Sequence, residues 1–173
     1  MKQTLIVNLF SGPGSGKSTF CAGIFAQLKW LNVNCEMALE YAKDLVWEQS
    51  FKKLENQLYV FAKQQNRIFK LNSKVDVILT DSPLLLSIIY DAKNDDLFKQ
   101  FILREHHKFN NFNIFLQRKK QYVQDGRIQT LEESIQIDNQ IKDLLINNNI
   151  YFETIDAIPE NIMLIVQKIL KNK

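Results

Sequence analysis

Residues 11–19 read Ser-Gly-Pro-Gly-Ser-Gly-Lys-Ser-Thr, and they follow the apolar run Leu-Ile-Val-Asn-Leu-Phe at residues 5–10. A helical pattern begins at about Lys17, so this order predicts a strand, a glycine-rich turn and a helix. Glycines let backbone N–H groups point inward around phosphate oxygens, and the first turn of a helix has unpaired donors and a partial positive charge. The stretch therefore predicts a loop that holds a polyphosphate.

The residues that we expect to bind a nucleoside triphosphate, ATP, form this loop and the turn after it. They are Gly12, Pro13, Gly14, Ser15, Gly16, Lys17, Ser18 and Thr19. Lys17 is expected to reach the β- and γ-phosphates as a catalytic residue, and Ser18 to ligate Mg²⁺. Ser11 stands where the pattern G-x-x-x-x-G-K-[ST] has its first glycine. The alternative interpretation is an ordinary glycine-rich connection without a ligand.

Length and composition fit one α/β domain over residues 1–173, with 46% hydrophobic and 24% charged residues. A net charge of +3 is too small to indicate a nucleic-acid binder by itself. The two cysteines, Cys21 and Cys35, form no C-x-x-C pair, so we expect buried free thiols. No apolar run approaches the ~18 residues of a membrane span, and the N-terminus leads straight into the first strand. We therefore expect a cytoplasmic protein with no membrane partner.

Alternating strand and helix patterns predict an α/β fold, a five-stranded parallel sheet with helices on both faces. The predicted strands are residues 5–10, 35–39, 75–80, 113–116 and 151–155. The predicted helices are residues 17–31, 42–54, 55–71, 84–90, 95–108, 131–147 and 160–171. Ser82-Pro83 suits a helix start, with serine as the cap, and Thr130 with Glu133 predicts a capping box.

Two carboxylates are expected beside the phosphate loop because each follows a predicted strand. Asp81 ends the third strand and Glu40 ends the second, and ligands of open α/β sheets bind beyond the carboxyl ends of the strands. We expect Asp81 to hold the Mg²⁺ shell or accept a proton from the substrate, and Glu40 to grip or deprotonate the acceptor hydroxyl. The alternatives are a helix-capping aspartate and a solvated glutamate.

Residues 117–129 are polar and basic and contain Asp125-Gly126, which predicts a short lid. Arg118 and Arg127 flank it, and arginines on a closing lid can bring positive charge to a transferred phosphate as catalytic residues. Lys119 and Lys120 add charge to the same loop. The alternative is an exposed basic loop with no role.

Aromatic and amide residues of the middle region are candidates for a base-stacking acceptor pocket, with the hydrophobic core as the alternative. They are Tyr41, Trp47, Gln57, Tyr59, Phe61 and Gln65.

This ordered set resembles the P-loop kinases of small molecules. The phosphate loop, Glu40, Asp81 and the pair Arg118 and Arg127 occur in the order seen in thymidylate kinases and their phage relatives, and the similarity covers nearly the whole chain. The segment 58–65 resembles the thymidylate-kinase helix that reads the acceptor nucleotide. The resemblance implies transfer of the γ-phosphate of ATP, with Mg²⁺, to a hydroxyl of a nucleoside or nucleotide.

Three departures bear on the acceptor. Gln65 stands where thymidylate kinases have an arginine that grips the acceptor phosphate, with Arg67 two residues on, and Asp81-Ser82 stands where they have Asp-Arg. Residues 39–42, Leu-Glu-Tyr-Ala, replace Arg-Glu-Pro and are closer to the Glu-Tyr-Ala-Arg of ribosylnicotinamide kinases, with Lys43 in the arginine position. Acceptor phosphates are usually gripped by guanidinium groups, so an acceptor other than thymidylate is expected.

Residues 40–44 and 81–84 together are similar to phage kinases linked to thymidine hypermodification. That resemblance implies 5-hydroxymethyluracil in phage DNA as the acceptor, and duplex or single-stranded DNA with a modified pyrimidine as the partner. A free nucleoside, ribosylnicotinamide or a nucleoside monophosphate stays open as the acceptor. A P-loop ATPase or GTPase switch and a nucleotide sensor are alternatives of other classes, although the chain has no Asn-Lys-x-Asp guanine signature.

Overall fold

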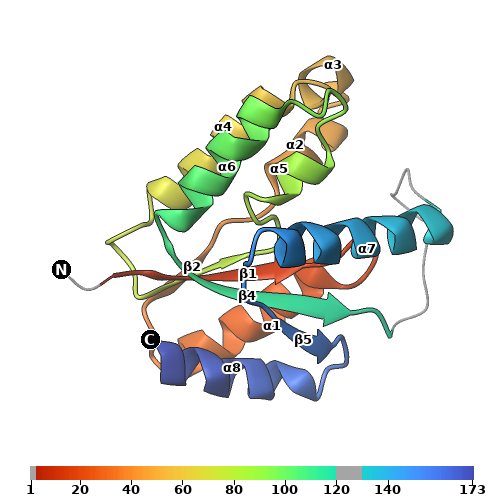
Figure 1. Cartoon of the computed structure of the whole chain (residues 1–173). Coiled ribbons are helices and arrows are strands. Elements are labelled where there is room, and N and C mark those ends of the chain that lie inside the picture. The colour runs from red at the N-terminus through yellow and green to blue at the C-terminus, as the bar shows by residue number, and fades with distance from the viewer. Residues whose placement is uncertain (1–2, 120–129) are drawn as a thin grey trace.

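The computed structural model describes residues 3–119 and 130–173, and Figure 1 shows the arrangement of its elements. The strands are β1 (Leu5–Phe10), β2 (Cys35–Met37), β3 (Val77–Thr80), β4 (Asn110–Gln117) and β5 (Glu153–Asp156). The helices are α1 (Lys17–Trp30), α2 (Tyr41–Trp47), α3 (Phe51–Leu54), α4 (Gln57–Phe69), α5 (Leu86–Ile89), α6 (Asp96–His107), α7 (Leu131–Asn147) and α8 (Asn161–Asn172).

The five strands form one sheet in the order β2-β3-β1-β4-β5, and every neighbouring pair is parallel. The chain direction is therefore the same in all five, so their carboxyl ends lie along one edge. The predicted five-stranded parallel sheet is confirmed. Because β1 lies between β3 and β4, the loop that follows β1 leaves the middle of that edge.

Helices cover both faces of the sheet, as predicted. Helices α1 and α8 lie on one face, and α4, α5, α6 and α7 lie on the other (Figure 1). The side chains of β1 alternate between these layers, because Val7 and Leu9 belong to the core under α1 whereas Ile6 and Phe10 belong to the opposite core. Two buried apolar layers thus hold β1, and the loop after it, in a fixed position.

Several boundaries differ from the sequence prediction. Strand β4 is longer than predicted, β2 and β3 are shorter, and the helix expected over 42–54 is divided into α2 and α3. The helix start predicted at Ser82-Pro83 is wrong, since α5 begins at Leu86. The Ser82 N–H instead donates to Thr80 Oγ1 at 3.1 Å, which forms a turn directly after β3. The capping box at Thr130 is confirmed.

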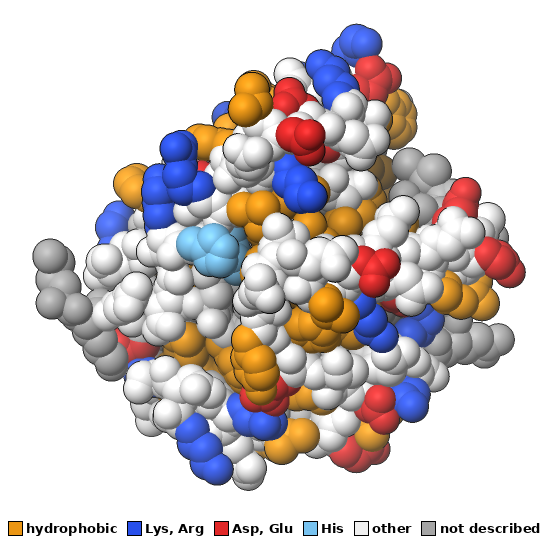
Figure 2. Space-filling view, viewed as in Figure 1, with side chains coloured by type: hydrophobic (Ala, Val, Ile, Leu, Met, Phe, Trp, Pro, Cys, Tyr) orange, Lys and Arg blue, Asp and Glu red, His pale blue; other side chains and the backbone are white. Residues whose placement is uncertain are grey.

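The cysteines are buried and free, as predicted. None of the helices in the described residues combines the length and the apolar character that a membrane crossing requires. The face in Figure 2 carries basic and acidic side chains interspersed, as expected for a net charge of +3.

Candidate active site

The loop between β1 and α1 has the backbone shape of an anion-binding turn. Gly14 and Gly16 have φ angles of 73° and 97°, a left-handed region that favours glycine. Helix α1 has no side-chain cap at Gly16 and no acidic residue in its first turn. Among the described residues, the buried hydroxyl of Ser15 also has no hydrogen-bond partner. Donors that lack a protein acceptor at the start of a 14-residue helix fit a polyphosphate.

Lys17 folds back over this loop. Its Nζ donates to the carbonyl oxygens of Ser11 at 2.7 Å and Gly12 at 3.1 Å. Burial lowers the pKa of the ammonium, and the carboxylates of Glu40, Asp81 and Asp138 oppose that change. The ammonium is therefore hydrogen-bonded to the loop backbone and lies in the field of three carboxylates. Ser18 is exposed at the start of α1.

The structure brings Glu40 and Asp81 to the same place beside Lys17. Asp81 is buried, and its Oδ1 accepts the backbone N–H of Glu40 at 3.0 Å, which ties the end of β3 to the residues after β2. Burial raises the pKa of the Glu40 carboxyl, and Lys17 partly offsets this effect. The described residues contain no cluster of three or more His, Cys, Asp or Glu side chains that could hold a metal ion alone. A Mg²⁺ ion at Asp81 and Ser18 would need phosphate oxygens and water as its other ligands.

Arg118 lies against the phosphate loop. Its Nη1 donates to the carbonyl oxygen of Pro13 at 2.9 Å, and its Nη2 pairs with Asp138 Oδ2 at 3.1 Å. The side chain is only 9% exposed. The lid was predicted over residues 117–129, but Gln117 is the last residue of β4; the rest of that range from residue 120, with Lys120 and Arg127, lies outside the described residues. A role for Arg127 stays a prediction.

Sequence reasoning missed Asp138, which lies in α7. Its Oδ1 accepts the Ser11 hydroxyl at 2.9 Å and also the Gly12 backbone N–H. A signal was present, because Ser134, Asp138, Ile141 and Leu145 follow the spacing of one helix face, and all four are buried. An acidic residue on the inward face of a helix needs a partner there.

Tyr90, directly after α5, was also missed. Burial raises the pKa of its hydroxyl, and the carboxylates of Glu40 and Asp138 raise it further.

Helices α2 and α4 meet beside Glu40 through an aromatic and charged cluster. The hydroxyls of Tyr41 and Tyr59 are 2.9 Å apart. The Arg67 guanidinium lies 5.2 Å from the centre of the Tyr41 ring, donates to the Leu39 carbonyl oxygen at 2.9 Å and pairs with Asp44. Its charge is thus already engaged.

Of the other residues predicted for an acceptor pocket, Gln65 is partly buried and stays a prediction, and three have surroundings unlike those of the two tyrosines. Phe61 is buried against phenylalanines of α6, so the core alternative holds for it. Trp47 is 75% exposed, and Gln57 donates to the Leu54 carbonyl oxygen. Gln64 takes the inner position instead, where its Oε1 accepts the Tyr41 N–H at 2.9 Å.

Comparisons with known proteins agree with this geometry. The fold is similar to that of the NadR protein in complex with NR, with a TM-score of 0.72 and 11% identity over 95% of this chain. The chain spans about half of that NadR chain, which it covers to 51%. It is also similar to thymidylate kinase from Ehrlichia chaffeensis, with a TM-score of 0.67 and 15% identity over 96% of this chain and 98% of that one. These likenesses show a P-loop kinase-like fold.

No curated protein matches the sequence. A family model described as an AAA domain matches residues 6–159, a range that includes the phosphate loop and most of the sheet and helices. That family has a P-loop, which implies nucleotide binding. The chain belongs to the AAA domain family of P-loop proteins.

Proposed function

We propose that this protein is an ATP-dependent phosphotransferase that moves the γ-phosphate to a hydroxyl of a nucleoside or nucleotide acceptor. The observation that carries the proposal is that Glu40 and Asp81, joined by a hydrogen bond at the carboxyl edge of the sheet, both act electrostatically on Lys17 of the phosphate loop. A phosphate loop alone would serve a hydrolase or a sensor equally well. A partly buried second carboxylate beside it suits a site that must also handle an acceptor proton.

The loop from Gly12 to Thr19 would hold the phosphates, and ATP supplies the phosphoryl group when it is bound. Lys17 would contact the β- and γ-phosphates, and Asp81 and Ser18 would orient Mg²⁺. Lys17 has to leave its loop carbonyls for this contact, and the phosphate oxygens would replace them as acceptors.

Glu40 would bind the acceptor hydroxyl and take its proton. The acceptor oxygen then forms a bond to the γ-phosphorus while the bond from that phosphorus to the β–γ bridging oxygen breaks, and ADP leaves. A carboxylate with a raised pKa is a better base than an ordinary glutamate, so the partly buried position of Glu40 supports this role.

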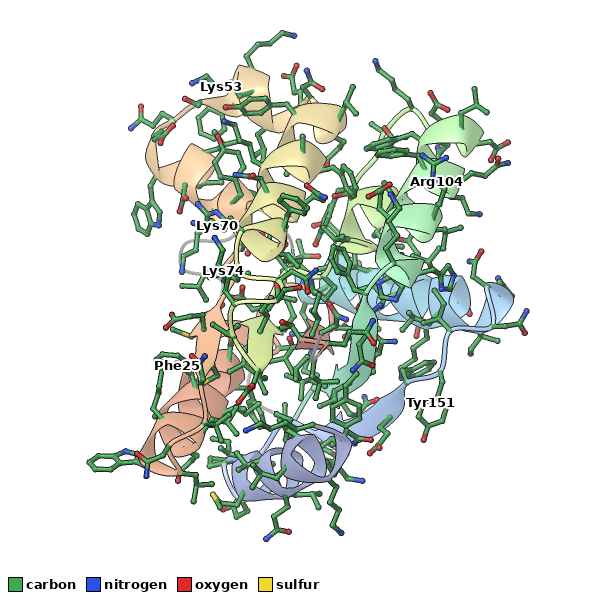
Figure 3. All side chains as sticks on the ribbon, turned by 90° about the vertical axis from the view of Figure 1, so that its left-hand side faces the viewer. Phe25, Lys53, Lys70, Lys74, Arg104 and Tyr151 are labelled. Atoms are coloured by element: carbon green, nitrogen blue, oxygen red, sulfur yellow. The ribbon has the colours of Figure 1, made fainter. Side chains whose placement is uncertain are left out.

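The acceptor proposal rests on Arg67 and Asp44. An acceptor that carries a phosphate would have to displace Asp44 from the arginine, which favours a hydroxyl without a phosphate beside it. The specific proposal is 5-hydroxymethyluracil in phage DNA, with a free nucleoside, ribosylnicotinamide or a nucleoside monophosphate as alternatives. Lys74, labelled in Figure 3, precedes β3 and lies at the amino edge of the sheet, so it is on the side opposite the candidate site and does not support a nucleic-acid backbone there.

Transfer of radiolabelled γ-phosphate to a panel of acceptors tests this proposal. The panel contains deoxynucleosides, nucleoside monophosphates, nicotinamide riboside, and DNA with or without 5-hydroxymethyluracil. Label in an acceptor supports the kinase, and label in inorganic phosphate alone overturns it in favour of an ATPase. A DNA acceptor further predicts that transfer falls steeply with added salt, whereas transfer to a free nucleoside does not.

A further inference from the structure

Three consecutive residues of the phosphate loop form hydrogen bonds with two charged side chains from elsewhere in the chain. Asp138 accepts the Ser11 hydroxyl and the Gly12 N–H, and Arg118 donates to the Pro13 carbonyl oxygen. Asp138 and Arg118 also pair with each other at 3.1 Å. We call these two side chains the clasp. It connects the end of β4 and the middle of α7 to the first half of the loop.

The clasp is buried and in tight contact with the loop. The side chains of Asp138 and Arg118 are 11% and 9% exposed. Around Gly12 the packing leaves no space, since an added Cβ would lie 2.5 Å from the Ser134 carbonyl oxygen of α7. Buried charged hydrogen bonds of this kind fix geometry, because losing one partner leaves the other unpaired in a low-dielectric site.

We propose that Asp138 is a positioning residue that keeps residues 11–13 in the shape that binds nucleotide phosphates, with Arg118 as its counter-ion. Ser11 contributes to this arrangement, because its hydroxyl donates a hydrogen bond to Asp138 that a glycine in this position would lack. The inference rests on the nucleotide-binding part of the proposed function and not on the identity of the acceptor.

The charge of Asp138 indicates that Arg118 also serves to position the phosphate loop. A bare carboxylate next to the phosphate loop would repel the phosphates of a nucleotide, and the arginine neutralises it. If Arg118 moved to a transferred phosphate, Asp138 would keep its two loop donors but would lose its counter-ion. Arg118 therefore acts on the loop, which differs from the lid role that the sequence suggested.

The test measures the Kd of ATP by calorimetry for Asp138→Ala, Asp138→Asn, Arg118→Gln and Ser11→Ala, together with steady-state kinetics. We expect Asp138→Ala to weaken ATP binding by about 10- to 100-fold, the loss of a charged hydrogen-bonded contact. Asp138→Asn keeps one acceptor oxygen and the side-chain size, so the variant should fold. Its Kd for ATP should lie between those of the wild type and Asp138→Ala. The control is Asp143→Asn, an exposed aspartate of the same helix, which should leave the Kd unchanged.

Two further measurements separate positioning from mere stabilisation. In the Asp138 variants the KM for ATP should rise while the KM for the acceptor stays constant. Ser11→Ala should weaken ATP binding less in an Asp138→Ala background than in the wild type. Wild-type ATP affinity in folded Asp138→Ala would overturn the inference. A loss of kcat in Arg118→Gln with unchanged ATP affinity would assign that residue to the transferred phosphate and overturn its part. ATP binding without transfer to any acceptor refutes the kinase and leaves this inference testable.

Discussion

Replacing Gly12 with alanine tests whether α7 and the phosphate loop are in close van der Waals contact. The added Cβ would lie 2.5 Å from the Ser134 carbonyl oxygen, 3.0 Å from Asp138 Oδ1 and 3.4 Å from the Ser134 carbonyl carbon. An ordinary contact begins at about 3.4 Å, so the loop and the helix must separate by roughly 1 Å. The closest obstacle is backbone, and no rotamer change can relieve the contact.

Overpacking of this kind costs about 1–3 kcal/mol. The resulting shift also lengthens the hydrogen bond between the Gly12 N–H and Asp138, so the loop donors lose their alignment. We expect a lower melting temperature and an ATP Kd raised about tenfold or more, measured by thermal denaturation and calorimetry.

Gly23→Ala is the matched control. The added Cβ of this α1 glycine would meet the Ile162 Cδ1 atom at 2.7 Å, the end of a side chain that can rotate away. Alanine also favours a helix over glycine by about 1 kcal/mol, so this variant should keep its stability and its ATP affinity. If Gly12→Ala binds ATP as tightly as Gly23→Ala does, the argument from contact between α7 and the loop is refuted.

Four further results are expected. Lys17→Ala should lower phosphate transfer by about 10²–10³-fold while the circular dichroism spectrum stays native, because it removes a positive charge from the reacting phosphates; undiminished turnover would contradict the assignment. Glu40→Gln should depress transfer and leave ATP binding nearly unchanged, whereas Asp81→Asn should weaken Mg²⁺-dependent turnover, with partial recovery at high Mg²⁺ in a titration. Because burial raises the pKa of Glu40, wild-type kcat/KM should fall with decreasing pH at a pH above the ordinary glutamate range, since the proton acceptor is then lost. A wild-type profile without that acidic limb, or an unchanged limb in the glutamine variant, would remove Glu40 from the reaction.

Local sequence patterns predicted the features that depend only on residues close together in the sequence. The strand over residues 5–10 agrees with β1, and the Thr130 capping box is present with both reciprocal hydrogen bonds. The prediction at Ser82 failed although its residue types were suitable. The Thr80 hydroxyl, which also donates to the Ala38 carbonyl oxygen of the neighbouring segment, accepts the Ser82 N–H and holds a turn. A contact across 42 positions therefore overrode a local preference.

The meeting of Glu40 and Asp81 could be predicted because it follows from parallel topology alone. Once β2 and β3 are parallel neighbours, residues shortly after their carboxyl ends lie close together, and the Glu40 N–H to Asp81 hydrogen bond forms there. The acceptor region lacked such a rule. The position of each aromatic residue there depends on how α2, α3 and α4 pack, and the sequence pattern did not separate the core residue Phe61 from the exposed Trp47.

Arg118 and Asp138 show where the prediction of function from local sequence ends. Both sequence and structure place Arg118 beside a phosphate site, but its role depends on which carboxylate it meets. Asp138 is 126 residues from the Gly12 N–H that it accepts, so no spacing rule connects the two. What the sequence does contain is a buried acidic position on α7 and a serine in place of the first loop glycine. Neither the acidic residue nor the serine is explained by its own neighbours in the sequence. The structure explains both by the hydrogen bond between the Ser11 hydroxyl and Asp138.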